Sequence, residues 1–128
     1  MPRVIALVED LLFLSRIREA ARGSGLEVSA LRGIEEVAAA AAGGAALVLV
    51  DADSDRLPWP AALDRLRAEP ALAEVPVVAF LSHVRRDRAE AARAHGATRV
   101  LARSAFVQEL SGLLANAAGG PPSQERNP

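Results

Sequence analysis

Acidic side chains stand directly after two apolar segments of this sequence, and they are the residues best suited to chemistry. Glu9 and Asp10 follow the first segment, and Asp51 and Asp53 follow the second. Carboxylates held close together repel one another, and a cation is needed to keep all of them ionised. A hard divalent ion such as Mg²⁺ takes oxygen ligands from carboxylates, backbone carbonyls and water, and a metal-assisted aspartate can attack phosphorus. We therefore predict a Mg²⁺ site; in the simpler alternative, these acids cap helices and are solvated.

Both groups of acids depend on strands to bring them together. The segment 45–50 is rich in Val and Leu, follows Gly43 and Gly44, and ends at Asp51, which is typical of a strand buried on both faces. The segment 3–8 has the same pattern and ends at Glu9. Because ligands bind at the carboxyl ends of the strands in an open parallel sheet, the acids are placed where a site is expected.

Segments that predict strands alternate with segments of helical spacing. The strands are predicted at 3–8, 26–31, 45–50, 75–81 and 98–102. The helices are predicted at 11–22, 34–42, 60–68, 85–95 and from Ser104, which could cap the last helix. This alternation predicts an α/β fold, a flavodoxin-like, doubly wound, five-stranded parallel sheet of order 2-1-3-4-5 with helices on both faces. Its switch point lies between the first and third strands, so Glu9, Asp10 and Asp51 are expected in one crevice.

The composition fits one domain with an aliphatic core. The chain has 128 residues, of which 51% are hydrophobic and 3% aromatic. We expect a domain at 1–117 and a flexible polar tail at 118–128. The net charge of -1 and the dispersed basic residues argue against nucleic acid or an anionic membrane as a partner. The chain has no cysteine and no apolar segment of membrane-spanning length, so we expect a cytoplasmic protein.

Four segments of the chain resemble receiver domains of two-component response regulators, and the resemblance extends to about residue 117. They are Val8-Glu9-Asp10, Leu47 to Asp51, Val75-Pro76-Val77-Val78 and Ala94-His95-Gly96-Ala97. The resemblance implies that Asp51 is the phosphoacceptor. It also implies that Asp10, Asp51 and the backbone carbonyl of Asp53 bind Mg²⁺ directly, with Glu9 as an outer ligand.

Several positions depart from the receiver pattern. Leu81 stands where receivers carry a Thr or Ser that hydrogen-bonds the phosphoryl group, and Ser82 comes one residue later. Arg103 replaces a lysine that pairs with the phosphoryl oxygens, and its planar fork has a different reach. Val100 replaces an aromatic residue that takes part in the switch. The residues that sense phosphate are thus altered more than the residues that bind metal.

These departures favour a pseudo-receiver, which is a stand-alone signalling module that binds a partner protein and has degraded phosphorylation switching. In the alternative, Asp51 is phosphorylated in a Mg²⁺-dependent phosphorelay, and Ser82 and Arg103 contact the phosphoryl group. A more remote alternative is a haloacid-dehalogenase-like phosphatase, with Asp51 as nucleophile and Asp53 as acid and base. That chemistry relies on a lysine, and the chain has none, so we expect no enzyme.

The resemblance implies that the partner is a histidine kinase, a phosphotransfer domain or a downstream effector. The first helix of receivers docks such partners, so Leu11 and Leu14 are candidate contacts, with burial in the core as the equal alternative. Charged residues around the fourth helix could pair in a homodimer across a two-fold axis, or form a solvated face. They are Arg85, Arg86, Asp87, Arg88 and Glu90. Trp59, between two prolines, either covers the crevice or holds its loop against the third helix.

Overall fold

Five parallel strands form one sheet at the centre of the molecule. The computed structural model describes residues 2–82 and 85–119. The strands pair in the order β2-β1-β3-β4-β5, and every pairing is parallel. Their bounds are β1 Arg3–Leu7, β2 Glu27–Ala30, β3 Leu47–Asp51, β4 Val77–Leu81 and β5 Arg99–Ala102. The predicted flavodoxin-like topology is confirmed.

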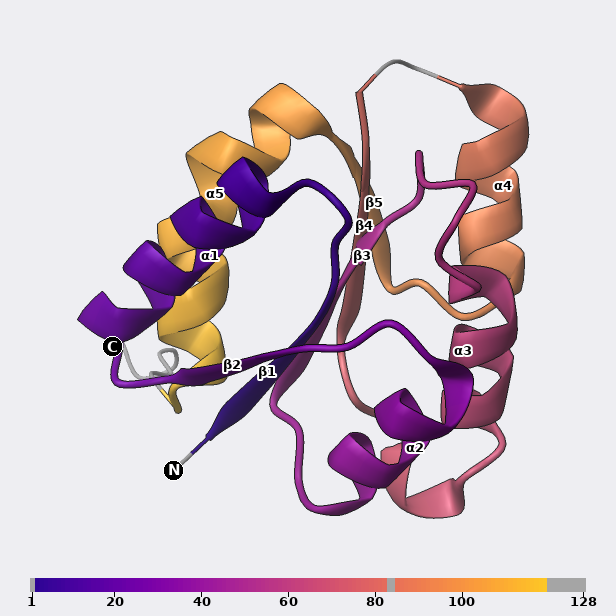
Figure 1. The fold of residues 1–128 in the computed structure, drawn as a ribbon, viewed down its shortest axis with the longest axis horizontal. Helices are drawn as coiled ribbons and strands as arrows, with labels where there is room; N and C mark the ends of the chain where they lie inside the picture. Colours follow the sequence, from indigo (N-terminus) through magenta and orange to yellow (C-terminus); the bar gives the residue numbers. More distant parts are fainter. Residues whose placement is uncertain (1, 83–84, 120–128) are drawn as a thin grey trace, which may run out of the picture.

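Helices cover both faces of the sheet (Figure 1). On one face lie α1 (Leu11–Gly23) and α5 (Arg103–Ala117), which run side by side. On the other lie α2 (Ile34–Ala42), α3 (Trp59–Arg67) and α4 (Arg86–Ala94), with a short 3₁₀ helix, η1 (Pro70–Leu72), after α3. This two-sided covering explains why β3 and β4 are buried at every position and have continuous apolar sequences.

The core consists of two apolar clusters, one on each face of the sheet. Alternate residues of the strands enter opposite clusters, as the two-residue period of a strand requires. In β1, for example, Ile5 faces the cluster that contains Leu63 of α3, whereas Val4 faces the cluster that contains Phe106 of α5. The sheet is thereby fixed between two helical layers, and its carboxyl edge is held in place.

Two local predictions need correction. β4 begins at Val77 rather than earlier, and Pro76 lies just before it, where its carbonyl accepts a hydrogen bond from the N–H of Val48 at 3.0 Å. Ser104 does not cap α5, because the helix begins at Arg103 with Ala102 in the cap position and no side-chain capping bond. Ala102 is still paired with Leu81 in the sheet, so strand and helix join without a loop.

Trp59 holds the loop between β3 and α3 rather than covering a crevice. Its side chain is buried in the core, and its indole Nε1–H donates to the backbone oxygen of Ser54 at 3.3 Å. Of the two roles predicted for Trp59, the structure shows the anchoring one. In the part of the chain that the structure describes, no helix has the length and apolar character needed to cross a membrane. Residues 120–128 of the predicted tail lie outside the described residues.

Candidate functional site

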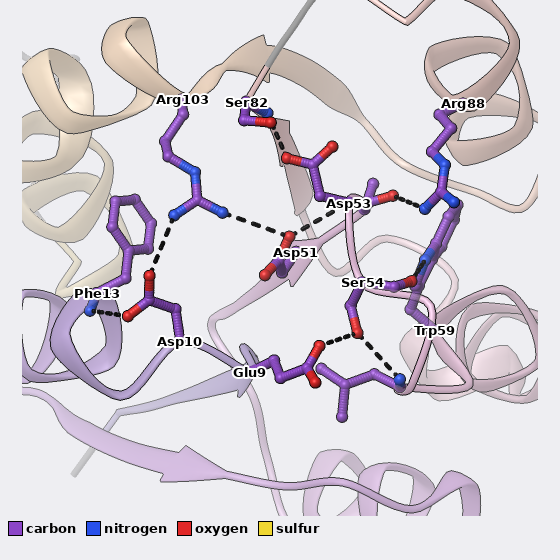
Figure 2. Close-up of polar contacts among 12 residues, drawn as sticks. Glu9, Asp10, Phe13, Asp51, Asp53, Ser54, Trp59, Ser82, Arg88 and Arg103 are labelled. Carbon is purple, nitrogen blue, oxygen red and sulfur yellow. Dashed lines mark hydrogen bonds and ion pairs between the residues drawn. The ribbon is translucent and has the colours of Figure 1, made fainter.

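The carboxyl ends of β1 and β3 bring three of the predicted acids to one edge of the sheet. The two strands are paired in parallel, with Leu7 opposite Val50. Asp51 is the last residue of β3 and is only 4% exposed. Glu9 and Asp10 follow β1, and Asp10 is exposed. Figure 2 shows these three side chains at this edge of the sheet, which is called the crevice below.

A guanidinium lies between the carboxylates of Asp10 and Asp51. Arg103, the first residue of α5, places Nη1 3.7 Å from Oδ2 of Asp10 and Nη2 3.7 Å from Oδ1 of Asp51. The two ends of the fork thus point to two acids that come from different strand ends (Figure 2). The arrangement is a bridged ion pair with one cation between two anions.

The aromatic rings of Phe13 and Phe80 contact the same guanidinium. Its central carbon lies 4.5 Å from the ring centroid of Phe13 and 5.3 Å from that of Phe80, within the range of a cation–π interaction. Phe80 in turn stacks on Phe106, with ring centroids 4.5 Å apart. Neither phenylalanine was singled out from the sequence, because their approach to Arg103 depends on how α1 and α5 pack on the sheet.

The two carboxylate oxygens of Asp10 make different contacts. Oδ1 accepts hydrogen bonds from the N–H groups of Leu12 at 3.0 Å and Phe13 at 3.2 Å, which caps the N-terminus of α1. Oδ2 faces Arg103. The helix-capping alternative predicted for the acids therefore applies to Asp10, together with the ion pair.

Glu9 turns toward the loop after β3. Its Oε1 accepts a hydrogen bond of 2.7 Å from Oγ of Ser54, and its Oε2 lies 3.4 Å from Nε of Arg56. Oγ of Ser54 also accepts the N–H of Leu57 at 3.0 Å, so this buried serine joins the loop to β1. Sequence reasoning missed Ser54, although a serine in a polar segment just after a strand is a known signal for such a turn.

The environment of Asp51 favours its protonated form. Burial raises the pKa of this carboxyl above its usual value of 3.8, and the hydrogen bond from the N–H of Asp53 and the charge of Arg103 oppose this rise. The charges of Asp53 and Glu9 raise the pKa further.

The loop that follows Asp51 is fastened on its other side by β4 and α4. Oδ2 of Asp53 accepts the backbone N–H of Ser82, and Nη1 of Arg88 donates to the backbone oxygen of Ala52 at 2.8 Å. Arg88 also pairs with Asp55. Leu81 is buried at the end of β4, so the residue aligned with the receiver hydroxyl position is an apolar core residue.

The predicted Mg²⁺ ligands do not form an open carboxylate cluster. Within residues 2–82 and 85–119, no three side chains of Asp, Glu, His or Cys come together as a group that could hold a metal ion. Asp10 and Asp51 face Arg103, Glu9 bonds to Ser54, and the Asp53 side chain accepts from Ser82. This donor set, as arranged, does not fit a divalent ion.

The two predicted partner contacts in α1 have different positions. Leu11 is 75% exposed, but Leu14 is 8% exposed and packs in the core, so the alternative of core burial applies to Leu14. Leu12, which the sequence did not single out, is 84% exposed. The exposed apolar pair beside the crevice is therefore Leu11 and Leu12.

One of the charged residues predicted to pair in a homodimer is turned inward. Arg88 bonds within the chain to Ala52 and Asp55, which removes it from the set available to a second copy. At the other end of α4, Nδ1 of His95 lies 2.6 Å from Oδ1 of Asp64 in α3. Helix α4 is therefore attached at both ends to neighbouring parts of the same chain.

Several solved structures that share this arrangement of strands and helices are response regulators or receiver domains. A putative response regulator from Chloroflexus aurantiacus J-10-fl is 19% identical, with a TM-score of 0.76 over 93% of this chain and 99% of that chain. The receiver domain of a sensor histidine kinase from Pseudomonas aeruginosa PAO1, solved with a magnesium ion in its active site cleft, is 20% identical, with a TM-score of 0.74 over 93% and 98%. An orphan response regulator of H. pylori is 14% identical, with a TM-score of 0.67 over 88% and 96%.

Sequence comparison adds no relative to these structural matches. No family model matches the chain, and no curated protein matches it. The likeness to solved structures shows the receiver fold, and the resemblance drawn from the sequence is confirmed at that level.

Proposed function

We propose that this chain is a receiver-like signalling module that acts by binding a partner protein, and that its crevice does not operate a phosphorylation switch. The observation that carries the proposal is the exposed pair Leu11 and Leu12, at 75% and 84% exposure, next to the crevice. Apolar side chains of this size gain about 1.5–3 kcal/mol each when they are fully buried. A protein partner with an apolar patch is the occupant that such a pair suits.

The partner classes are those of the receiver fold: a histidine kinase, a phosphotransfer domain or a downstream effector. Leu11 and Leu12 form the first turn of α1, and Asp10, which caps that turn, also faces Arg103. A partner on this turn would therefore contact an element whose position is tied to the crevice.

Among the residues that the structure describes, the last residue of β4 offers no hydroxyl that could turn a phosphoryl group into a conformational change. A phosphoaspartate adds about two negative charges and needs a group that gains a bond from them. Leu81 is buried and has no donor, and the backbone N–H of Ser82 is already bonded to Asp53. Burial also raises the pKa of Asp51 above its usual value.

The alternative, phosphorylation of Asp51, is supported by one feature. Nη2 of Arg103 lies 3.7 Å from Oδ1 of Asp51, where a cation could pair with an added phosphoryl group. Acetyl phosphate with Mg²⁺, followed by intact-mass measurement, separates the two functions, with Asp51→Asn as the control. We expect no stable phosphoryl adduct. An adduct on the wild type that is lost in Asp51→Asn would establish the alternative.

We also propose that the crevice has no phosphatase activity. Oδ2 of Asp53, the acid and base of that reaction, accepts a hydrogen bond from Ser82, and the chain has no lysine. An assay with a generic aryl phosphate ester tests this, and we expect no turnover above buffer. Phosphate release that disappears in Asp53→Asn would show an enzyme instead.

Partner binding is tested by comparing the wild type with Leu11→Ser/Leu12→Ser and with Arg86→Ser, an exposed residue at the start of α4. We expect the double substitution to weaken a partner's affinity by more than about tenfold. Arg86→Ser should leave the affinity unchanged. Equal binding by all three proteins would remove α1 as the docking element.

A further inference from the structure

We propose that Arg103 is the resident counter-cation of the acidic crevice, so that this chain balances the carboxylates of Asp10 and Asp51 with its own guanidinium and does not take up a divalent ion there. This charge balance does not depend on the signalling role of the chain. If Arg103 did not supply it, the exposed side chains of Leu11 and Leu12 would still be available to a partner.

The position of the guanidinium is the first reason. Its Nη1 and Nη2 lie at equal distances, 3.7 Å, from Asp10 and Asp51, and these carboxylates come from the ends of adjacent strands. A divalent ion that bridged the same two oxygens would have to lie beside the guanidinium. Two cations at that separation repel strongly in a partly buried site.

The attachment of the guanidinium is the second reason. Its face lies against Phe13 at 4.5 Å and Phe80 at 5.3 Å, and its backbone is the first turn of α5, directly after β5. The rings occupy one side of the guanidinium, so swinging it away would lose both contacts. A lysine ammonium has no planar face to stack in this way and no fork to reach two acids at once.

The third reason is that other carboxylate oxygens of Asp10 and Glu9 already have partners within the chain. Oδ1 of Asp10 caps α1, and both oxygens of Glu9 face Ser54 or Arg56. Direct metal ligation by Glu9 would break a contact that holds the loop, and the one oxygen of Asp10 that does not cap α1 is Oδ2, which faces Arg103. Arg103, in contrast, faces Oδ2 of Asp10, which the helix cap does not use, and Oδ1 of Asp51, which also accepts the N–H of Asp53 at 3.1 Å.

Removal of Arg103 should therefore turn the crevice into a cation site. In Arg103→Ala, Asp10 and Asp51 face each other without a positive charge, and a divalent ion becomes the available counter-charge. The variant should bind Mg²⁺ about tenfold or more tightly than the wild type. Ligand binding to the folded state raises the unfolding temperature with ligand concentration, so this gain is measurable without any activity.

The experiment measures thermal unfolding of the wild type, Arg103→Ala and Arg99→Ala in MgCl₂ and in NaCl of equal ionic strength. Arg99 is the matched control because it lies in β5 and pairs with Glu109 at 2.8 Å, away from the crevice. We expect a Mg²⁺-specific rise in unfolding temperature in Arg103→Ala alone, abolished when Asp51→Asn is added. An equal Mg²⁺-specific rise in the wild type would overturn the proposal.

A direct binding measurement keeps the proposal testable even where Arg103→Ala does not fold. Mn²⁺ is titrated into the wild type and followed by electron paramagnetic resonance and by the fluorescence of Trp59, the single tryptophan of the chain. Trp59 bonds to Ser54, which bonds to Glu9, so it lies close enough to respond. We expect no stoichiometric Mn²⁺ site. One bound Mn²⁺ per wild-type chain, lost in Asp10→Asn, would overturn the proposal independently of any Arg103 variant.

Discussion

Arg67 donates two hydrogen bonds to the backbone carbonyl of Gly96, from Nε at 3.2 Å and from Nη2 at 2.8 Å. Its Nη1 also donates to the carbonyls of Leu72 and Ala73, both at 3.0 Å. One side chain at the end of α3 thus satisfies backbone oxygens of two separate turns. The turn before β5, and with it the start of α5, is positioned by this contact.

Gly96→Ala should destabilise the fold. Gly96 has φ +113, and an added Cβ would lie 2.7 Å from Cγ of Arg67. We expect a loss of about 1–3 kcal/mol in the free energy of unfolding, measured by urea denaturation. Gly112→Ala is the control, because Gly112 lies within α5 with no atom near its added Cβ. It should gain up to about 1 kcal/mol, and equal effects of the two substitutions would contradict the strained turn.

Leu14→Ala and Leu12→Ala should differ sharply in stability, although the residues are two positions apart. Leu14 is in the core, so its truncation should cost about 2–5 kcal/mol. Leu12 is exposed, so its truncation should change stability by less than about 0.5 kcal/mol. Denaturant unfolding of both variants checks this. Similar losses in the two proteins would mean that α1 is rotated relative to the position described above.

Ser54→Ala should destabilise the loop that follows β3. The substitution removes the bond to Glu9 and leaves the buried N–H of Leu57 without its acceptor. We expect a loss of roughly 1–3 kcal/mol, together with a change in the fluorescence of Trp59. Ser111→Ala, at an exposed position of α5, serves as the comparison and should be nearly neutral. An unchanged Trp59 signal would argue against the anchoring role of Ser54.

The stability of the wild type relative to Asp51→Asn should fall as the pH rises above 3.8. Burial raises the pKa of Asp51 above this value in the folded protein, so the folded state holds a proton that the unfolded chain has released. The stabilisation is fully present below the unfolded pKa and is lost as the pH rises through the folded pKa. The amide introduced by Asp51→Asn cannot titrate, and carboxyl groups that do not interact with Asp51 cancel in the difference.

Urea denaturation of the wild type and Asp51→Asn across the acid range measures this difference. The stability of Asp51→Asn minus that of the wild type should be larger above the folded pKa of Asp51 than it is in acid. A difference that stays constant, or one that moves in the opposite direction, would mean that Arg103 outweighs burial at this site.

The strands were predictable because their signal is local. β1, β3 and β4 are short apolar runs, and the acids at or just after the ends of β1 and β3 mark the carboxyl edge. The inward face of α1 was harder, because four consecutive apolar residues, 11–14, allow more than one helical phase. Only the packing of α1 against the sheet and α5 places Leu14 inside and Leu12 outside.

The crevice was predicted in its location but not in its chemistry. Strand order alone places Glu9, Asp10 and Asp51 on one edge. The contacts of Arg103 with Asp10 and Phe13 join residues far apart in the chain, and they depend on the side-by-side packing of α1 and α5. No periodicity or spacing in the sequence encodes such a contact.

The direct junction of β5 and α5 makes the crevice sensitive to changes in chain length. Ala102 both pairs with Leu81 and precedes the first helical residue, so no flexible linker separates the sheet from Arg103. Insertion of a single residue there would rotate the following side chains by about 100° around the helix axis. The guanidinium would then face away from Asp10 and Asp51, and length at this junction is as constrained as residue type.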